Sequence, residues 1–208
     1  MIIKKFIVGP LENNCFILSD EKSRETFIVD PGDEPDRILD FINENKLKVK
    51  YIVCTHAHFD HIAAVSDIKE ETKAAIVLHK DDLEIYKSAK EHAALFGFEL
   101  YSMPEPDIFV TEGDQLTVGS LTFMVIHSPG HTPGGICLYG EGLVITGDTL
   151  FAGSVGRTDL YGGDISKLRD SAKRLMALAD DVRVLPGHGP ESTVGLERKN
   201  NFFLQNME

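Results

Sequence analysis

Short apolar runs alternate with turns and amphipathic stretches along the first third of the chain. The runs have the length and β-branched content of strands, and Gly9-Pro10 and a charged segment separate them. Ile38, Phe41 and Ile42 then recur at helical spacing before another apolar run follows. The pattern predicts a strand–helix–strand unit. Its predicted elements are strands at Ile2–Val8, Asn14–Leu18, Thr26–Val29 and Val49–Cys54, and a helix at Pro35–Asn45.

The same alternation continues through the rest of the chain, with strands more frequent in the second half. Further helices are predicted at Ile62–Thr72, Asp81–Leu95, Ile165–Ala179 and Leu196–Gln205. Further strands are predicted at Ala75–Leu78, Ile108–Val110, Gln115–Val118, Leu121–Ile126, Gly135–Tyr139, Leu143–Thr146 and Val182–Leu185. No linker or repeat divides the pattern, so we expect one domain over residues 1–208, with two sheets and helices outside them.

Residues 96–104 show neither the helical nor the strand periodicity. The segment is apolar, but Gly97 and Pro104 interrupt it. A buried structural loop and a lid that faces substrate both fit this pattern.

Composition narrows the possible partners and the compartment. The net charge of −12 argues against a nucleic-acid partner, and no apolar run approaches the ~18 residues of a membrane span. No N-terminal signal pattern is present. The three cysteines lie in or beside apolar runs without CxxC spacing, which favours reduced core residues. We therefore expect a cytoplasmic protein with no membrane or nucleic-acid partner; the pattern leaves its oligomeric state open.

Metal-binding side chains are concentrated directly after the fourth predicted strand. Residues 55–61 read Thr-His-Ala-His-Phe-Asp-His and contain three of the chain's eight histidines. Side chains alternate along a strand, so His56 and His58 would share one face. The following turn would carry Asp60 and His61 to a neighbouring position. One short segment could thus serve two adjacent metals.

Three later loops, each after a predicted strand, add candidate ligands. Tight turns near a ligand favour glycine, and glycine precedes the ligand candidate in each loop. Seven ligands suit two adjacent divalent ions, such as zinc, better than one closed structural zinc; iron and manganese also fit the donor set. The other three histidines, His79, His92 and His127, are interpreted as structural. The seven candidates are His56, His58, Asp60, His61, His131, Asp148 and His188.

Together these motifs resemble the metallo-β-lactamase superfamily. The similarity lies in His-Ala-His-Phe-Asp-His at 56–61, Pro-Gly-His-Thr-Pro-Gly at 129–134, Thr-Gly-Asp at 146–148 and Pro-Gly-His-Gly at 186–189. Within the superfamily the chain is most similar to glyoxalase II-like (hydroxyacylglutathione hydrolase-like) hydrolases. The resemblance implies a mixed α/β (α+β) fold, a four-layer αββα sandwich with the metals at one edge between the sheets.

The resemblance also implies a role for each site residue. His56, His58 and His131 would hold one metal, Asp60, His61 and His188 the other, and Asp148 would bridge them. Asp30 and Thr55 would orient ligands without binding metal. Two divalent ions lower the pKa of bound water towards about 7, and Asp60 and Asp148 would orient the nucleophile and move its proton.

The expected substrate is a small-molecule acyl thioester, because a thiolate leaves with little help from a general acid. Glyoxalase II enzymes carry a further helical C-terminal domain that contacts glutathione, and this sequence ends before one. Glutathione itself is therefore left open as the thiol carrier.

Other functions remain open within the same resemblance. A mono-iron persulfide dioxygenase has similar motifs, including a Gly-Arg-Thr-Asp stretch like that at 156–159. A lactonase, a β-lactamase and a non-enzymatic binding protein with a vestigial site are further alternatives. Metal content and the reaction catalysed distinguish them.

Overall fold

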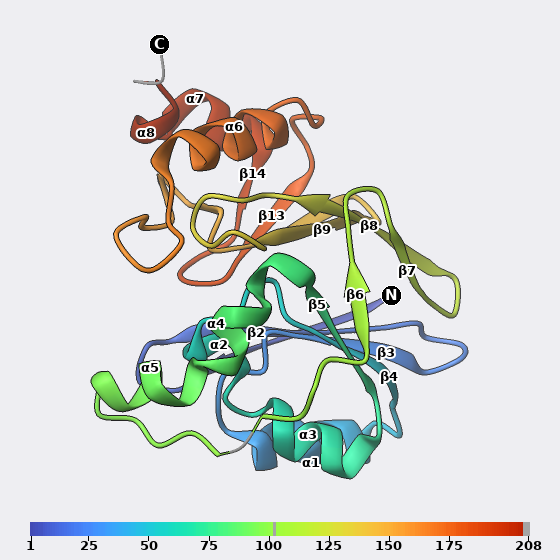
Figure 1. Ribbon diagram of the computed structural model, residues 1–208. Helices are drawn as coiled ribbons and strands as arrows, with labels where there is room; N and C mark the ends of the chain where they lie inside the picture. The colour runs from blue at the N-terminus through green and yellow to red at the C-terminus, as the bar shows by residue number, and fades with distance from the viewer. Residues whose placement is uncertain (102, 206–208) are drawn as a thin grey trace.

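The computed structural model describes residues 1–101 and 103–205. Its core is two six-stranded sheets that pack face to face (Figure 1). The elements in chain order are β1 (Ile2–Val8), β2 (Asn13–Ser19), β3 (Glu25–Val29), α1 (Pro35–Glu44), β4 (Lys48–Val53), α2 (Phe59–Ile62), α3 (Val65–Thr72), β5 (Ala75–His79), a 3-10 turn (Lys80–Asp82), α4 (Leu83–Lys87), α5 (Ala89–Leu95), β6 (Ile108–Val110), β7 (Gln115–Val118), β8 (Leu121–His127), β9 (Ile136–Gly140), β10 (Leu143–Gly147), β11 (Leu150–Phe151), β12 (Ser154–Val155), α6 (Ile165–Leu175), β13 (Arg183–Pro186), β14 (Ser192–Thr193), α7 (Val194–Asn200) and α8 (Phe202–Gln205).

Sheet A contains the strands of the N-terminal half in sequence order, β1 to β6. Its first three strands are antiparallel, whereas β3, β4, β5 and β6 run parallel to one another. Helical segments connect the parallel strands β3, β4 and β5, as parallel pairing requires. The carboxyl ends of β3, β4 and β5 therefore meet at one edge of the sheet.

Sheet B has the order β14-β13-β10-β9-β8-β7. Its strands are antiparallel except for β10 and β13, which α6 connects as a crossover. The turns after β8, β10 and β13 carry the candidate ligands of the C-terminal half.

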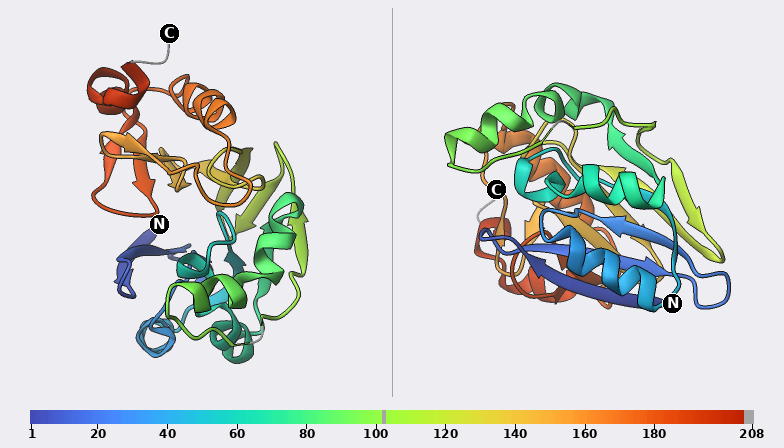
Figure 2. Two further views of the ribbon diagram at one scale, coloured as in Figure 1. Left: turned by 60° about the vertical axis from the view of Figure 1, so that its left-hand side comes forward. Right: turned by 90° about the horizontal axis from the view of Figure 1, so that it is seen from below.

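Three separate groups of buried side chains show four layers. One lies between sheet A and the helices beneath it, one between the two sheets, and one between sheet B and α6 and α7. The turned views show α1 and α3 on the outer face of sheet A and α6 on that of sheet B (Figure 2). The expected αββα sandwich is confirmed.

The sequence pattern merged several short helices. The helix predicted at Ile62–Thr72 is instead α2 and α3, because the Ala64 amide turns away to donate to the Pro31 carbonyl (3.0 Å). The helix predicted at Asp81–Leu95 breaks at Ser88, whose hydroxyl bonds the carbonyls of the preceding turn.

Two C-terminal predictions also need correction. The helix predicted at Leu196–Gln205 begins at Val194 and breaks at Asn201, whose side chain donates to the Ser154 carbonyl (3.0 Å). The helix predicted at Ile165–Ala179 ends at Leu175. Periodicity does not detect the break at Asn201, because it depends on a contact with a segment distant in the sequence.

Candidate metal centre

All seven predicted ligands gather at one edge of the sandwich. The first four follow β4 of sheet A, and the others follow β8, β10 and β13 of sheet B. An isolated bridge between Asn13 and His188 joins the two halves there, together with a hydrogen bond from the Asn14 amide to the Gly187 carbonyl (2.7 Å). Loops from both sheets thus meet over one small volume.

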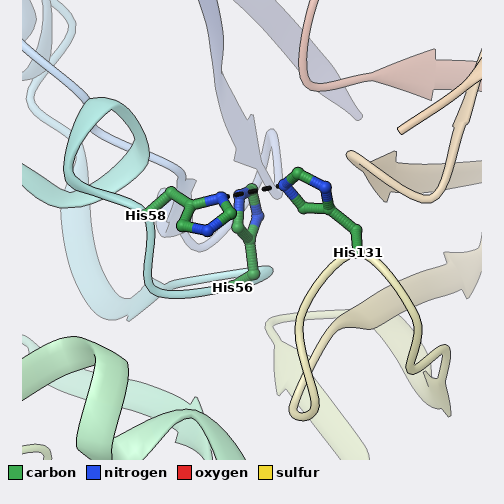
Figure 3. Close-up of side chains that lie close together, drawn as sticks. All are labelled: His56, His58 and His131. Atoms are coloured by element: carbon green, nitrogen blue, oxygen red, sulfur yellow. Dashed lines mark hydrogen bonds between the residues drawn. The ribbon is translucent and has the colours of Figure 1, made fainter. Parts of the chain in front are cut away.

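One group of ligand candidates consists of His56, His58 and His131. Their nearest ring nitrogens all lie within 4.8 Å of one another, and His58 Nδ1 is 2.9 Å from His131 Nε2. The three rings converge from two different loops (Figure 3). His131 Nδ1 donates to the Arg157 carbonyl (2.7 Å), which leaves the lone pair of Nε2 facing the group.

A second group consists of Asp60, His61 and His188. His188 Nε2 lies 3.3 Å from Asp60 Oδ2 and 3.2 Å from His61 Nε2. Asp148 lies between the two groups: Oδ2 is 3.4 Å from His131 Nε2, and Oδ1 is 3.4 Å from His61 Nε2. This carboxylate can therefore contact ions in both positions.

The donor set contains two buried polar atoms without a hydrogen-bond partner, His56 Nε2 and Asp148 Oδ1. An unsatisfied buried polar atom costs about 1–3 kcal/mol. A cation would satisfy both, since one offers a ring lone pair and the other a carboxylate oxygen. The residues present therefore fit metal ions.

The two groups differ in their proton affinity. Burial, with a contribution from His131, lowers the pKa of His58 to about 3, and burial also holds the pKa of His56 well below its ordinary value. Both rings are then neutral, the form that binds metal. Burial alone would lower the pKa of His61 as well, but Asp148 and Asp60 raise it to about 10. A metal ion at the second group would compete with this proton.

Asp30 orients the loop that carries the first ligands. Its carboxylate accepts hydrogen bonds from the amide (2.7 Å) and hydroxyl (2.6 Å) of Thr55, and lies 3.0 Å from His61 Nδ1. The other nitrogen of His61 therefore faces Asp60 and His188. These contacts are those expected of residues that orient ligands.

Asp82 is a second buried carboxylate, which the sequence pattern did not single out. It lies at the end of the turn after β5 and accepts hydrogen bonds from the Ala57 amide (2.9 Å), the Thr132 hydroxyl (2.9 Å) and the Gly134 amide (2.6 Å). Ala57 separates His56 from His58, and Thr132 follows His131. One side chain thus connects the ligand loops of the two sheets.

The ionisation of Asp82 gives a pH-dependent prediction. Burial raises its pKa to about 6, above the ordinary value of 3.8. The folded state then binds this proton more tightly than the unfolded chain, so the contribution of Asp82 to stability is largest below about pH 4 and falls as the pH rises through about 6. This difference of about two pKa units corresponds to roughly 3 kcal/mol in the free energy of unfolding. Urea unfolding of the parent protein and of Asp82→Asn should be measured between pH 4 and 7. The free energy of unfolding of the parent, relative to that of the variant, should fall by this order as the pH rises. A difference that does not change with pH would contradict it.

Gly187 leaves space for the second group. A Cβ at this position would lie 2.3 Å from Asp148 Oδ1 and 2.8 Å from His61 Cε1. No side chain larger than hydrogen fits without moving a candidate ligand. The close approach explains the glycine before His188.

The three remaining histidines lie outside both groups. His79 stacks on His127 with ring centroids 4.1 Å apart and planes 11° apart. His79 Nδ1 accepts from the Asp81 amide, and His127 Nε2 lies 3.0 Å from the Pro133 carbonyl. Although Asp81 is near, stacked parallel rings cannot direct their in-plane lone pairs at one ion. His92 lines the pocket in front of the site.

Two further sequence-based interpretations agree with the structure. Arg157 and Asp159 pair with each other through two hydrogen bonds of 2.6 and 2.7 Å. All three cysteines are free and buried, and burial raises the pKa of Cys54 well above its ordinary value, so this thiol is not a nucleophile.

The described part of residues 96–104 is partly buried and partly beside the pocket. Leu100 is buried and Phe98 packs on Phe59 with ring centroids 5.2 Å apart, whereas Phe96 lines the pocket beside the candidate ligands. Residue 102 lies outside the described residues.

The sequence matches the profile of the Metallo-beta-lactamase superfamily over residues 8–188. The chain belongs to this superfamily. It is thus a metal-dependent hydrolase of the metallo-beta-lactamase fold, and it carries the His/Asp groups that such an enzyme needs.

Similar proteins cover the chain almost from end to end. Hydroxyacylglutathione hydrolase GloC of Haemophilus influenzae is 34% identical over 98% of this chain and 98% of its own length. The crystal structure of TTHA1623 in a di-iron-bound form is 39% identical over 97% of this chain and all of that one, with a TM-score of 0.90. The crystal structure of BLEG-1 B3 metallo-beta-lactamase is 33% identical over 99% of this chain and all of that one, with a TM-score of 0.92. Among the described residues of this superfamily member, no helix is long and apolar enough to cross a bilayer.

Proposed function

We propose that the protein is a dinuclear metal-dependent thioesterase. The observation that carries this proposal is the position of Asp148, whose two carboxylate oxygens face two separate groups of ligand candidates 3.4 Å away on either side. The di-iron form of a structural relative and the hydroxyacylglutathione hydrolase among the sequence relatives support it.

The seven residues would divide between two positions. His56, His58 and His131 would hold one ion, and Asp60, His61 and His188 the other, with Asp148 between them. Zinc suits this mixture of imidazole and carboxylate donors; iron and manganese suit it too. When bound, such ions lower the pKa of water from about 15.7 towards about 7 and polarise a carbonyl oxygen.

The chain's own residues would orient the reactants. Burial opposes ionisation of Asp60, but His61 and His188 hold the pKa of this carboxyl well below its usual range. Asp60 therefore stays ionised and can accept a hydrogen bond from the attacking water. Asp148, which lies between the two groups, would do the same and would take up the proton.

A thioester suits this arrangement. Arg157 is the only lysine or arginine among the described residues that line the pocket over the ligand groups, and it is paired with Asp159, so neither residue type is free there to protonate a leaving group. A thiolate with a pKa near 8.5 leaves without one.

The test combines metal analysis with activity assays on one sample purified without added metal. Two divalent ions per chain with hydrolysis of S-D-lactoylglutathione or simpler acyl thioesters supports the proposal. One iron per chain with oxygen consumption on glutathione persulfide would instead show a persulfide dioxygenase. Nitrocefin turnover without thioesterase activity would show a β-lactamase, and full metal loading without any turnover would show a non-enzymatic metal protein.

A further inference from the structure

A pocket of about 480 Å³ opens onto the candidate metal centre. His58, Asp60, His131, Asp148 and His188 form its floor, so a bound molecule would lie directly over the ligand groups. The volume falls in the range of small-molecule sites, about 300–1,000 Å³.

The walls of this pocket are apolar and come from both halves of the fold. Leu95 and Phe96 lie at the end of α5, and Leu160 and Tyr161 lie in the segment after β12. Leu11, Phe59 and Ile85 complete the apolar lining.

Several of these apolar side chains are more than half exposed to solvent. Leu95 is 82% exposed, Tyr161 70% and Phe96 54%. Apolar side chains gathered around a pocket are typical of a surface that binds an apolar ligand.

The polar part of the lining is not arranged for an anionic ligand. Arg157 is the only lysine or arginine among the described lining residues, and both arms of its guanidinium fork are bonded to Asp159. Along the walls, the carboxylates of an anionic thiol carrier would therefore find no unpaired lysine or arginine among the described lining residues.

We propose that the substrate is a thioester that carries an apolar chain, and that Leu95, Phe96, Leu160 and Tyr161 bind this chain. The inference rests on the proposed thioesterase function and specifies its substrate class. In the reaction, water adds its oxygen to the acyl carbon and the C–S bond breaks. The products are a carboxylate, a thiol and one released proton.

Two series of synthetic thioesters test the inference on the metal-loaded protein. In the first, acyl groups from acetyl to octanoyl are joined to N-acetylcysteamine, a small uncharged thiol. In the second, acetyl is joined to alkanethiols of increasing length. We expect kcat/KM to rise along at least one series, by up to about four-fold for each methylene buried, which corresponds to about 0.8 kcal/mol. The series that rises shows whether the chain belongs to the acyl group or the thiol.

Variants identify the surface that binds the chain. Leu95→Ala and Tyr161→Ala should reduce the dependence of kcat/KM on chain length, while the metal content per chain stays the same as in the parent protein. Leu196→Ala is the matched control, because Leu196 is 53% exposed on α7 and does not line the pocket. It should leave the dependence unchanged.

The possible failures are distinguishable. Flat series together with efficient hydrolysis of S-D-lactoylglutathione would overturn this inference and leave the thioesterase proposal intact. An equal loss of chain-length dependence in Leu196→Ala would also overturn it. No hydrolysis of any thioester at full metal loading would overturn both.

Discussion

Replacing Asp148 by asparagine is expected to lower hydrolysis by roughly 10²–10³-fold or more, the effect of removing one key electrostatic group from a catalytic site. The carboxylate contributes one oxygen to each ligand group, at 3.4 Å from His61 and from His131. An amide of the same shape is uncharged and can offer only one oxygen. We therefore expect fewer than two ions to remain per chain after dialysis.

Asp170→Asn is the matched control for this variant. Asp170 is exposed on α6 and belongs to neither ligand group, and the substitution makes the same change of charge. It should retain full metal content and activity. If Asp148→Asn retained both as well, a role for Asp148 between two ions would be wrong.

Replacing Asp82 by asparagine is expected to lower activity or metal affinity by about 10–100-fold, the usual effect of losing a residue that orients metal ligands. Asparagine keeps the volume, but its amide nitrogen cannot accept a hydrogen bond from Ala57, Thr132 or Gly134. The connection between the loop of His56 and His58 and the loop of His131 is then weakened, since only one oxygen remains to accept these hydrogen bonds. Asp82 bonds residues beside the ligand candidates, so its replacement would act by moving these two loops.

Two opposing free-energy terms suggest that this variant folds. Leaving a buried donor without an acceptor costs about 1–3 kcal/mol. Removing the buried charge recovers roughly 3 kcal/mol, the amount that corresponds to its raised pKa. Near pH 7 the stability should change little, so a loss of activity reports on the ligand loops.

Metal titration and steady-state kinetics together test the role of Asp82. Excess metal should restore part of the activity of Asp82→Asn, which a purely structural defect would not allow. Asp81→Asn changes the adjacent carboxylate, whose side chain is 47% exposed, and should behave like the parent protein. Equal losses in both variants would contradict a specific role for Asp82.

The gathering of the ligand candidates at one edge could be predicted from sequence, because the loops that carry them follow strands. The histidines after β4, β8 and β13 and the aspartate after β10 occupy turns at strand ends, and a two-sheet sandwich brings such turns to one edge. Periodicity alone predicted two sheets with helices outside them. The resemblance to a known family added the four-layer αββα arrangement.

The residues that hold those turns in place could not be predicted in the same way. Asp82 follows Asp81 in a polar turn, and nothing local distinguishes the buried carboxylate from the exposed one. Asn14 is similar: its side chain donates to the carbonyls of Pro186 and Gly189, more than 170 positions away. Such roles depend on contacts between distant loops. The two-residue strands β11, β12 and β14 were missed because they are too short to show a period.

The most direct measurement is anomalous X-ray diffraction from crystals of the metal-loaded protein, recorded at the absorption edge of the bound metal. We expect two peaks per chain, one among His56, His58 and His131 and the other among Asp60, His61 and His188, each within about 2.0–2.2 Å of its ligand atoms. Asp148 should lie between the peaks. A single peak, or a second peak outside these two groups, would contradict a dinuclear centre.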